Sequence, residues 1–279
     1  MGRARFQMRQ PAAPWTPLIT LALLGASGSV RAEPCATYRV AHYAQGLLFF
    51  RDEQGREAGV DADVARELAR RTGCNLVEVL ESRVRIWDQF RHGALDITLS
   101  AVPSPEREQL AELVPYLKGR SFIVTRGALA AELPNADSFV AASQLRVAVV
   151  KTYLYGAKID GWLGQLRAQR RVEEMADFAA AARLFESGRV DAIVVNPLSY
   201  PALLKLVKPT ESLHLPPWGR GDKTVVCVAL SRTRVSDQDR RRIRMALNDM
   251  IRDGTMEAIA KRYVGANTAH DLVFDGKTD

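Results

Sequence analysis

The feature that most constrains the fold is an alternation that begins at Tyr38. Short runs rich in β-branched and apolar residues take turns with stretches whose apolar residues recur at helical spacing. The runs that we interpret as strands are Tyr38–Ala41, Leu76–Leu80, Leu95–Leu99, Ser121–Thr125, Leu145–Val150, Arg189–Val195 and Val225–Leu230. Because parallel strands need a crossover between them, usually a helix, this order predicts an α/β chain.

Local signals mark the ends of several predicted helices. Asp61 is placed to cap the free amides of a helix whose inward face holds Val64 and Leu68, and Gly73 is placed to end it. Trp87 recurs at helical spacing with Ile86 and Phe90, which predicts a core position rather than a ligand platform. We expect the last helices at Asp237–Arg252 and Met256–Tyr263.

The alternation breaks once, at a loop-like segment over residues 127–138 that is rich in Ala, Pro, Asn and Asp. A second alternation follows, and the strand Val225–Leu230 would return the chain to the first unit. We therefore expect two α/β halves that face each other across a cleft, where ligands commonly bind. The expected boundaries are residues 33–125 and 225–267 for lobe 1, 126–224 for lobe 2, and a tail at 268–279.

The first 32 residues have the pattern of a secretory signal peptide. Met1–Thr16 carries three arginines and no acid, Pro17–Ala26 is apolar, and Val30-Arg31-Ala32 offers small or compact residues for cleavage. About ten apolar residues are too few for the roughly twenty that a membrane-spanning helix requires. Later, even Val140–Val150 is interrupted by polar residues. The sequence thus predicts export and a soluble mature protein.

Charge argues against nucleic acid as a partner. The formal net charge is +7, but the four arginines of the predicted signal account for much of it and their removal leaves +3. The remaining basic clusters, such as Arg240–Arg242, are typical of solvated helix faces and are not interleaved with aromatic residues. We expect no nucleic-acid binding.

The three cysteines are informative in an exported chain. Cys35 and Cys74 each lie just before a predicted strand, and in a parallel unit both would lie at the same edge of the sheet. We predict a Cys35–Cys74 disulfide, which by loop entropy would stabilise the fold by roughly 3 to 4 kcal/mol. Cys227 lies within an apolar strand and is expected to be a buried, unpaired thiol.

No motif in the chain predicts catalysis or a cofactor. The four histidines are dispersed, without a His-x-x-His or Cys-x-x-Cys pair, which argues against a metal site. There is also no phosphate-binding glycine loop and no Gly-x-Ser-x-Gly turn. We expect no metal, no cofactor and no enzymatic activity.

Several motifs in register carry a resemblance to a known family. They are Gly59-Val60-Asp61-Ala62-Asp63-Val64-Ala65, Gly93-Ala94-Leu95-Asp96, Ser104-Pro105-Glu106-Arg107, Gly188-Arg189-Val190-Asp191-Ala192 and Asp253-Gly254-Thr255. Together they resemble the bacterial extracellular solute-binding proteins of family 3, the polar amino-acid type, over nearly all of Tyr38–Gly265. The resemblance implies a two-lobed type II Venus-flytrap fold with crossover strands near Phe122–Arg126 and Val225–Leu230.

The resemblance also implies a role. Such proteins are periplasmic, deliver a small solute to the permease of an ABC importer, and are expected to act as monomers. The same fold occurs in sensor domains of signalling receptors and, rarely, in enzymes such as cyclohexadienyl dehydratase, so these remain alternatives. A dehydratase would need a placed acid, with Glu81, Glu106 or Asp191 as nominal candidates. No kinase, cyclase or membrane segment follows Asp279, which favours transport.

In the first lobe the resemblance assigns the ligand carboxylate to Arg107. Ser104-Pro105 is a strong helix start, which would place Arg107 beside exposed amides at a positive dipole end. The alternative is an exposed arginine paired with Glu108 or Glu112. Ser100 would help to hold the same carboxylate, and Val102 stands where relatives have Thr or Ser, so that only its backbone can serve.

The remaining ligand positions depart from the family pattern. Thr152 occupies a position that is usually glycine, and with Tyr153 it would donate to the ligand. Asn196 replaces the acid that pairs with a ligand ammonium, so the ligand lacks a free α-amine or another acid such as Asp160 or Asp222 takes over. Tyr43 is expected to line the cleft. Arg83 either binds a second anionic group, which would favour a dicarboxylate, or is solvated at the surface.

Overall fold

The computed structural model describes residues 1–2, 34–208 and 211–276. Residues 34–279 form one compact unit, separate from residues 1–33, and only this unit is considered below. The predicted signal segment, apart from its first two residues, lies outside the described residues. None of the helices in the described part of the chain combines the length and the apolar character that a bilayer crossing requires.

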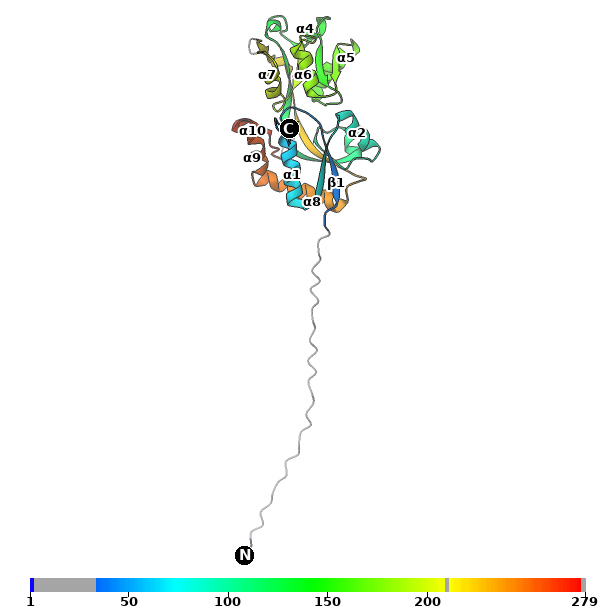
Figure 1. Cartoon of the computed structure of the whole chain (residues 1–279), viewed down its shortest axis with the longest axis vertical. Coiled ribbons are helices and arrows are strands. Elements are labelled where there is room, and N and C mark those ends of the chain that lie inside the picture. The colour runs from blue at the N-terminus through cyan, green and yellow to red at the C-terminus, as the bar shows by residue number, and fades with distance from the viewer. Residues whose placement is uncertain (3–33, 209–210, 277–279) are drawn as a thin grey trace. The chain divides into compact units, whose positions relative to one another are not determined.

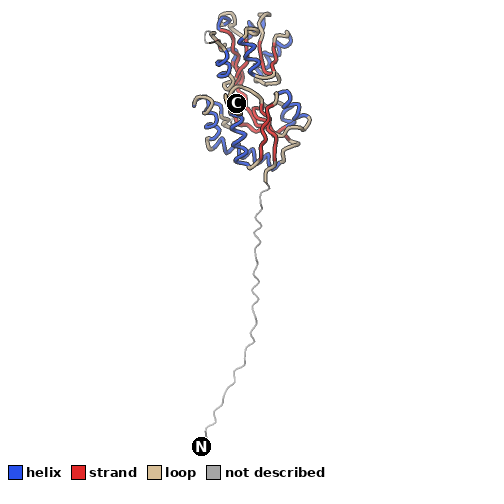
Figure 2. The backbone as a smooth tube through the Cα atoms, in the orientation of Figure 1, coloured by secondary structure: helices blue, strands red, loops and turns tan. Residues whose placement is uncertain are grey.

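A nine-stranded sheet runs through the described residues of this unit in the order β4-β1-β5-β11-β6-β9-β7-β8, with β10 paired to β6. Figure 2 shows the strands in red. At one end β1 pairs in parallel with β4 and β5, and at the other β7 pairs in parallel with β8 and β9. We call these two groups of strands the first half and the second half. The bounds are β1 Thr37–His42, β4 Asn75–Leu80, β5 Ile97–Ala101, β6 Ala111–Arg126, β7 Val147–Val150, β8 Val172–Met175, β9 Ala192–Val195, β10 Leu213–His214 and β11 Arg220–Ser231, and a separate hairpin joins β2 Phe50–Arg51 to β3 Glu57–Ala58.

Two long antiparallel strands connect the halves. β11 pairs with β5 in the first half and with β6 over most of its length, while Phe122–Thr125 of β6 pairs with β9 in the second half. The crossover strands that were expected near Phe122–Arg126 and Val225–Leu230 are therefore present, although both strands are longer than predicted. The α/β class with two halves is confirmed.

Helices cover both halves (Figure 1). In the first half they are α1 Val60–Thr72, α2 Arg83–Arg91, α3 Pro105–Leu110, α8 Asp237–Arg252, α9 Thr255–Lys261 and α10 Ala266–Leu272; in the second they are α4 Ala136–Ala141, α5 Ala157–Ala168, α6 Phe178–Glu186 and α7 Tyr200–Leu206, with 3₁₀ turns η1 Gly127–Leu129 and η2 Pro217–Gly219. Gly73 ends α1 in the left-handed conformation, as predicted. Asp61 does not cap α1, which has no side-chain cap; its carboxylate faces the core instead.

Two elements differ from those predicted from the sequence. The helix that starts at Ser104-Pro105 ends after Leu110, and the chain passes directly into β6, which is 16 residues long. A third C-terminal helix, α10, follows the two that were predicted, and its Leu272 is buried. For α3 and β6, contact with a distant strand decides the outcome, because β11 pairs with the first part of β6.

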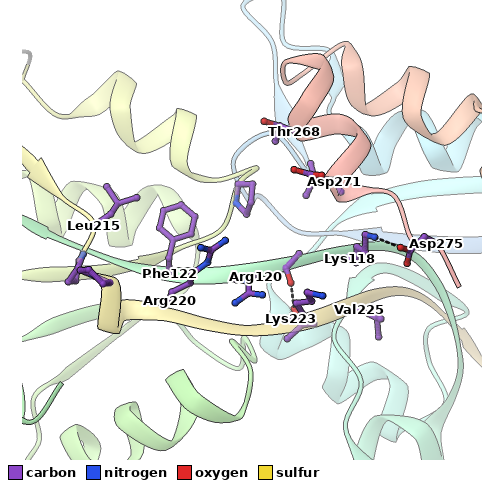
Figure 3. Close-up of a pocket in the computed structure, with 16 residues that line it drawn as sticks. Lys118, Arg120, Phe122, Leu215, Arg220, Lys223, Val225, Thr268, Asp271 and Asp275 are labelled. Carbon is purple, nitrogen blue, oxygen red and sulfur yellow. Dashed lines mark hydrogen bonds and ion pairs between the residues drawn. The ribbon is translucent and has the colours of Figure 1, made fainter. Parts of the chain in front are cut away.

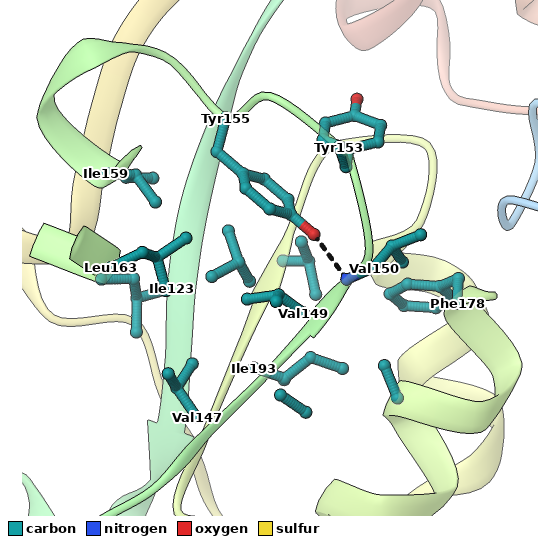
Figure 4. Packing of buried hydrophobic residues seen from close by; sticks show 14 of the residues in the cluster. Ile123, Val147, Val149, Val150, Tyr153, Tyr155, Ile159, Leu163, Phe178 and Ile193 are labelled. Atoms are coloured by element: carbon teal, nitrogen blue, oxygen red, sulfur yellow. Dashed lines mark hydrogen bonds between the residues drawn. The ribbon is translucent and has the colours of Figure 1, made fainter. Parts of the chain in front are cut away.

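One apolar cluster fills the second half and continues to first-half residues such as Trp87 and Leu95. In the second half, side chains of β7, β9, α5 and α6 pack together, and the Tyr155 hydroxyl accepts the backbone N–H of Val150 at 2.9 Å (Figure 4). Tyr153, two residues earlier, turns its hydroxyl away from this cluster. Burying one such large apolar side chain contributes about 1.5 to 3 kcal/mol, so the strand ends that carry the site are rigidly placed.

The predicted disulfide is confirmed. Cys35 and Cys74 are bonded, with 39 residues of sequence separation, immediately before the paired residues Thr37 and Asn75 of β1 and β4. Cys227 is buried and free, as expected, and burial raises the pKa of its thiol to about 12.

Candidate functional site

Arg107 lies at the junction of the two halves. Its backbone N–H donates to the Ser104 side chain at 3.4 Å, as the helix-start motif predicted. The guanidinium Nη1 donates to the carbonyl of Val102 in the first half at 2.7 Å, and Nη2 donates to the carbonyl of Thr152 in the second half at 2.9 Å. Only 5% of the residue is exposed. The alternative of an exposed arginine paired with Glu108 or Glu112 is therefore wrong.

The surroundings of Arg107 weaken its hold on its proton. Burial, together with the nearby charge of Arg83, lowers the pKa of the guanidinium to about 9. The face of the guanidinium packs on the Trp87 ring, with its carbon 4.3 Å from the ring centroid. Such a cation is poorly solvated and gains more than an exposed one from an anionic partner.

The predicted dipole contribution at Arg107 is small. Helix α3 has only 6 residues, so few aligned peptide groups add to a positive end. What positions Arg107 is the pair of carbonyl acceptors and the Trp87 face. Trp87 is buried, as predicted, but it also supports Arg107; its i, i+4 spacing from Arg83 on α2 was the signal that it faces the same site.

Arg83 lies in the same interior. It is 2% exposed, so the surface alternative is wrong. Its guanidinium carbon lies 4.3 Å from the ring centroid of Tyr43 and 4.7 Å from that of Tyr153, between one ring from each half. Nη1 donates to the Ser100 carbonyl at 3.3 Å, whereas Nε and Nη2 are buried without a hydrogen-bond partner.

Ser100 is part of a network that the sequence did not reveal. It has a left-handed backbone, with φ 54°, and its hydroxyl donates to Asp61 Oδ2 at 2.6 Å. The Tyr116 hydroxyl donates to Asp61 Oδ1, and the Tyr43 hydroxyl donates to the Ser100 carbonyl at 3.3 Å. Burial raises the pKa of Asp61. Both Asp61 oxygens are thus engaged inside the wall of the site.

The second half contributes Thr152, Tyr153 and Asn196. Thr152 has a left-handed backbone, with φ 61°, and presents its carbonyl to Arg107. Asn196 Nδ2 donates to the Tyr153 hydroxyl at 3.2 Å, while its Oδ1 accepts the backbone N–H groups of Leu198 and Ser199, both at 2.9 Å. The amide oxygen of Asn196 is therefore used by its own loop.

The two acids considered as substitutes for the missing ammonium partner are also engaged. Asp160 Oδ2 accepts the backbone N–H groups of Tyr155 at 3.0 Å and Gly156 at 3.1 Å. Asp222 Oδ2 accepts the backbone N–H of Lys158 at 2.7 Å. Both carboxylates thus satisfy free amides at the start of α5. The structure brings the predicted ligand residues together, and it places these acids in a structural role.

Other candidate places do not coincide with the predicted ligand residues. A cavity of about 1020 Å³ lies along β6 and β11 and is lined by residues that include Lys118, Arg120, Phe122 and Arg220 of these strands and Asp271 and Asp275 near the end of the described chain (Figure 3). None of the predicted ligand residues lines it. The ligand atoms of Cys35, Cys74 and Asp239 also lie close enough together to hold a metal ion. However, the two sulfurs are bonded to each other, and Asp239 accepts a hydrogen bond from the Tyr38 hydroxyl at 2.6 Å.

Two α/β halves joined by two crossover strands, with buried guanidinium groups where the halves meet, define a two-lobed binding protein of the type II periplasmic-binding-protein fold. The chain belongs to family 3 of the bacterial extracellular solute-binding proteins, whose sequence model matches residues 40–266. The resemblance carried by the motifs is thereby confirmed. No curated protein sequence matches the chain.

Solved structures agree on the fold. An ancestral arginine-binding protein bound to arginine is 21% identical with a TM-score of 0.69, and the match covers 82% of this chain and 98% of that one. EhuB in complex with hydroxyectoine is 18% identical with a TM-score of 0.70, covering 85% and 92%. A putative L-cystine ABC transporter from Listeria monocytogenes is 18% identical with a TM-score of 0.66, covering 83% and 97%.

Proposed function

We propose that the protein is the periplasmic substrate-binding component of an ABC importer for a small, polar solute that bears a carboxylate. The observation that carries this proposal is the position of Arg107, a buried guanidinium held between carbonyls of both halves. In the proposal, residues 33–125 and 225–267 act as one lobe and residues 126–224 as the other. The ligand is enclosed between them, and the closed protein is presented to a permease.

The physical basis of the proposal is that a ligand carboxylate would stabilise the charged guanidinium of Arg107. Arg107 is desolvated, which is why its pKa is lowered to about 9, and a ligand carboxylate would compensate the lost hydration. A charge-assisted hydrogen bond of this kind is worth about 1.5 to 3 kcal/mol. Because Arg107 reaches both halves, this contact also favours the closed arrangement, so binding shifts the population toward closure.

A thermal-shift screen tests the proposal. Purified protein is melted with amino acids, dicarboxylates and amines, and a true ligand at about 100 times its dissociation constant should add roughly 2.7 kcal/mol of stability. Arg107→Ala should remove most of that shift. The matched control is Arg91→Ala, which removes an arginine that is exposed and paired with Glu106 at 2.9 Å. A shift that persists in Arg107→Ala would place the anion contact elsewhere.

Two alternatives share the fold. A sensing partner of a signalling receptor would bind its ligand through the same contacts. Deleting the gene should abolish uptake of the ligand if the protein serves transport, and should abolish the signalling response if it serves sensing. For a cyclohexadienyl dehydratase, the nominal acids are each engaged elsewhere: Glu81 pairs with Arg39 at 3.5 Å, Glu106 is 63% exposed, and Asp191 accepts the Arg146 N–H at 2.8 Å. Turnover of prephenate or arogenate by the purified protein would nevertheless replace the binding proposal.

A further inference from the structure

Arg83 is distinguished by donors that the protein leaves unused. Nε and Nη2 are buried and have no hydrogen-bond partner, although a buried donor without a partner costs free energy. Arg171 is the useful comparison, because it is 3% exposed, nearly as buried as Arg83. Its donors reach the carbonyls of Leu145, Val140, Phe139 and Ala142 and the side-chain oxygen of Gln169. Arg171 is satisfied by the fold, whereas Arg83 is not.

The unused donors of Arg83 lie on one edge of its guanidinium. The group packs against the rings of Tyr43 and Tyr153, and Nη1 donates to the Ser100 carbonyl. The two nitrogens without a partner, Nε and Nη2, lie on the same edge, which carries Nε–H and one N–H of Nη2. These two donors form a parallel fork, which is the geometry that matches the two oxygens of a carboxylate.

The surrounding charge favours an anion at that edge. Within the described residues no ion pair joins Arg83 or Arg107 to a carboxylate, and the charge of Arg83 acts on Arg107 strongly enough to lower its pKa. The carboxylate of Asp61 acts electrostatically on Arg83, but both of its oxygens accept hydrogen bonds, from Ser100 and Tyr116. Two buried cations without a dedicated counter-charge are stabilised by a ligand that brings two negative charges.

The groups considered as partners for a ligand ammonium already accept hydrogen bonds from the protein itself. The Asn196 oxygen is held by its own loop, and Asp160 and Asp222 are held by the start of α5. A ligand guanidinium is also disfavoured. Arg83 already packs against the two tyrosine rings, and its positive charge would repel a second cation.

We propose that the site binds a small dicarboxylate without a free α-ammonium group, with one carboxylate at Arg107 and the second on the Nε–Nη2 edge of Arg83. This inference rests on the proposed function, because it assumes that the junction of the halves is the ligand site. Arg83 acts as the residue that selects a diacid and rejects cationic amino acids.

The test compares ligands that differ by one charge. Isothermal titration calorimetry at pH 7 is run with the straight-chain diacids from malonate to adipate, with the monoamide of each diacid that binds, and with glutamate and arginine. In the wild-type protein the best diacid should bind about 10- to 100-fold more tightly than its monoamide, which keeps one carboxylate and loses the other charge. This comparison needs no variant.

Two variants then assign the preference to Arg83. Arg83→Met should bind the diacid and its monoamide within about threefold of each other, because the group that distinguishes them is gone, and Arg83→Lys should retain part of the preference by its charge. The matched control is Arg85→Met on the same helix; Arg85 is 76% exposed and lies 3.8 Å from Glu81, so the wild-type preference should persist. Thermal melts confirm that each variant is folded.

The outcomes distinguish a failure of the inference about Arg83 from a failure of the proposed function. If glutamate or arginine binds through Arg107 while no diacid does, the inference about Arg83 is wrong and the proposed function stands. If a diacid and its monoamide bind the wild type equally, the second carboxylate does not reach Arg83 and the inference again fails. If no carboxylate of any kind binds, both the inference and the proposed function are overturned.

Discussion

Arg107 shows at the residue scale how burial prepares a side chain for a ligand. The folded protein lowers the pKa of its guanidinium to about 9, well below its ordinary value, so the unliganded fold disfavours the charged form. Above about pH 9 the unfolded chain holds the proton that the folded protein loses, so this group's penalty to folding is fully present below pH 9 and is progressively relieved above it. An anionic ligand acts in the opposite direction, because it favours the charged form.

We therefore predict a decline of affinity at alkaline pH. Affinity for the carboxylate ligand should be constant from pH 7 to 8 and should then fall by about tenfold per pH unit above pH 9, as Arg107 loses its proton. Calorimetric titrations at half-unit steps measure it. Burial raises the pKa values of Tyr43 and Tyr153, so neither ring should titrate first. An affinity that is unchanged up to pH 10.5 would contradict the role given to Arg107.

Asn196 supports a second prediction. In Asn196→Asp, one carboxylate oxygen can still accept the N–H groups of Leu198 and Ser199, and the other can accept from the Tyr153 hydroxyl, so the fold should be retained. The new negative charge should weaken diacid binding by about tenfold and strengthen binding of the matching amino acid by a similar factor. Calorimetry with glutarate and glutamate measures both changes.

The control for this prediction is Asn248→Asp, the same change on an exposed position of α8. It should leave both affinities within about twofold of wild type, because salt screens the interaction between an exposed surface charge and a ligand bound elsewhere. If Asn196→Asp behaves like the control, the side chain of residue 196 does not face the ligand.

The residue scale also shows what the sequence could and could not predict. Arg107 and its Ser104 cap follow from neighbours in sequence, so a local motif was enough to find them. The role of Asp61 depends on Ser100 and Tyr116, which are 39 and 55 positions away. No local pattern encodes such contacts, and the capping role expected for Asp61 was wrong for that reason.

At the scale of elements, the disulfide holds the first two parallel strands together. Cys35 and Cys74 precede β1 and β4, and the bond closes a chain segment with a sequence separation of 39. We predict that Cys35→Ala/Cys74→Ala lowers the free energy of unfolding by roughly 3 to 4 kcal/mol, through the greater entropy of the unfolded chain. Urea unfolding of the oxidised proteins measures the difference.

The reductant provides the internal control for that prediction. Wild-type protein in dithiothreitol should match the double variant, and the double variant should itself be insensitive to dithiothreitol. Ligand affinity should change little, because the bond lies before the strands and the ligand residues follow them. A double variant as stable as the oxidised wild type would show that the β1–β4 pairing does not need the bond.

Element lengths were harder to predict than element types. The sequence predicted a helical stretch after Ser104-Pro105, but α3 ends at Leu110 and β6 begins at the next residue. Pro115 was an available signal against a long helix. In β6 this residue faces Cys227 at an irregularity of the β6–β11 register, where a missing N–H is tolerated. The strand forms because β11 offers a partner along its length, which is a tertiary effect.

At the scale of the compact unit, the two halves also touch at a place away from Arg107 and Arg83. The N–H of Leu47 donates to the carbonyl of Leu198 at 2.7 Å, and the Leu198 side chain packs into the apolar cluster of the first half. Gly46 lies at this contact with φ 53°, and a Cβ there would lie 2.5 Å from the Leu198 oxygen and 2.6 Å from the Ser199 Cα. Both of those atoms are backbone of the second half, so the contact leaves no room for a side chain.

This geometry gives a prediction about closure. Gly46→Ala should force the loop after β1 away from the loop after β9, which disfavours the closed arrangement without touching Arg107 or Arg83. Apparent affinity falls by the fraction of molecules that can still close, so we expect a loss of about tenfold or more. In small-angle scattering, ligand should reduce the radius of gyration of the wild type clearly and that of Gly46→Ala much less.

Gly55→Ala separates closure from backbone strain. Gly55 also has a positive φ, of 77°, in the turn between β2 and β3, but a Cβ there meets nothing within 4 Å. Both variants should lose about 1 kcal/mol of stability from the disfavoured conformation. Only Gly46→Ala should lose affinity, because only its methyl group meets the other half. Equal affinities for the two variants would mean that the Leu47–Leu198 contact is not part of the ligand-bound state.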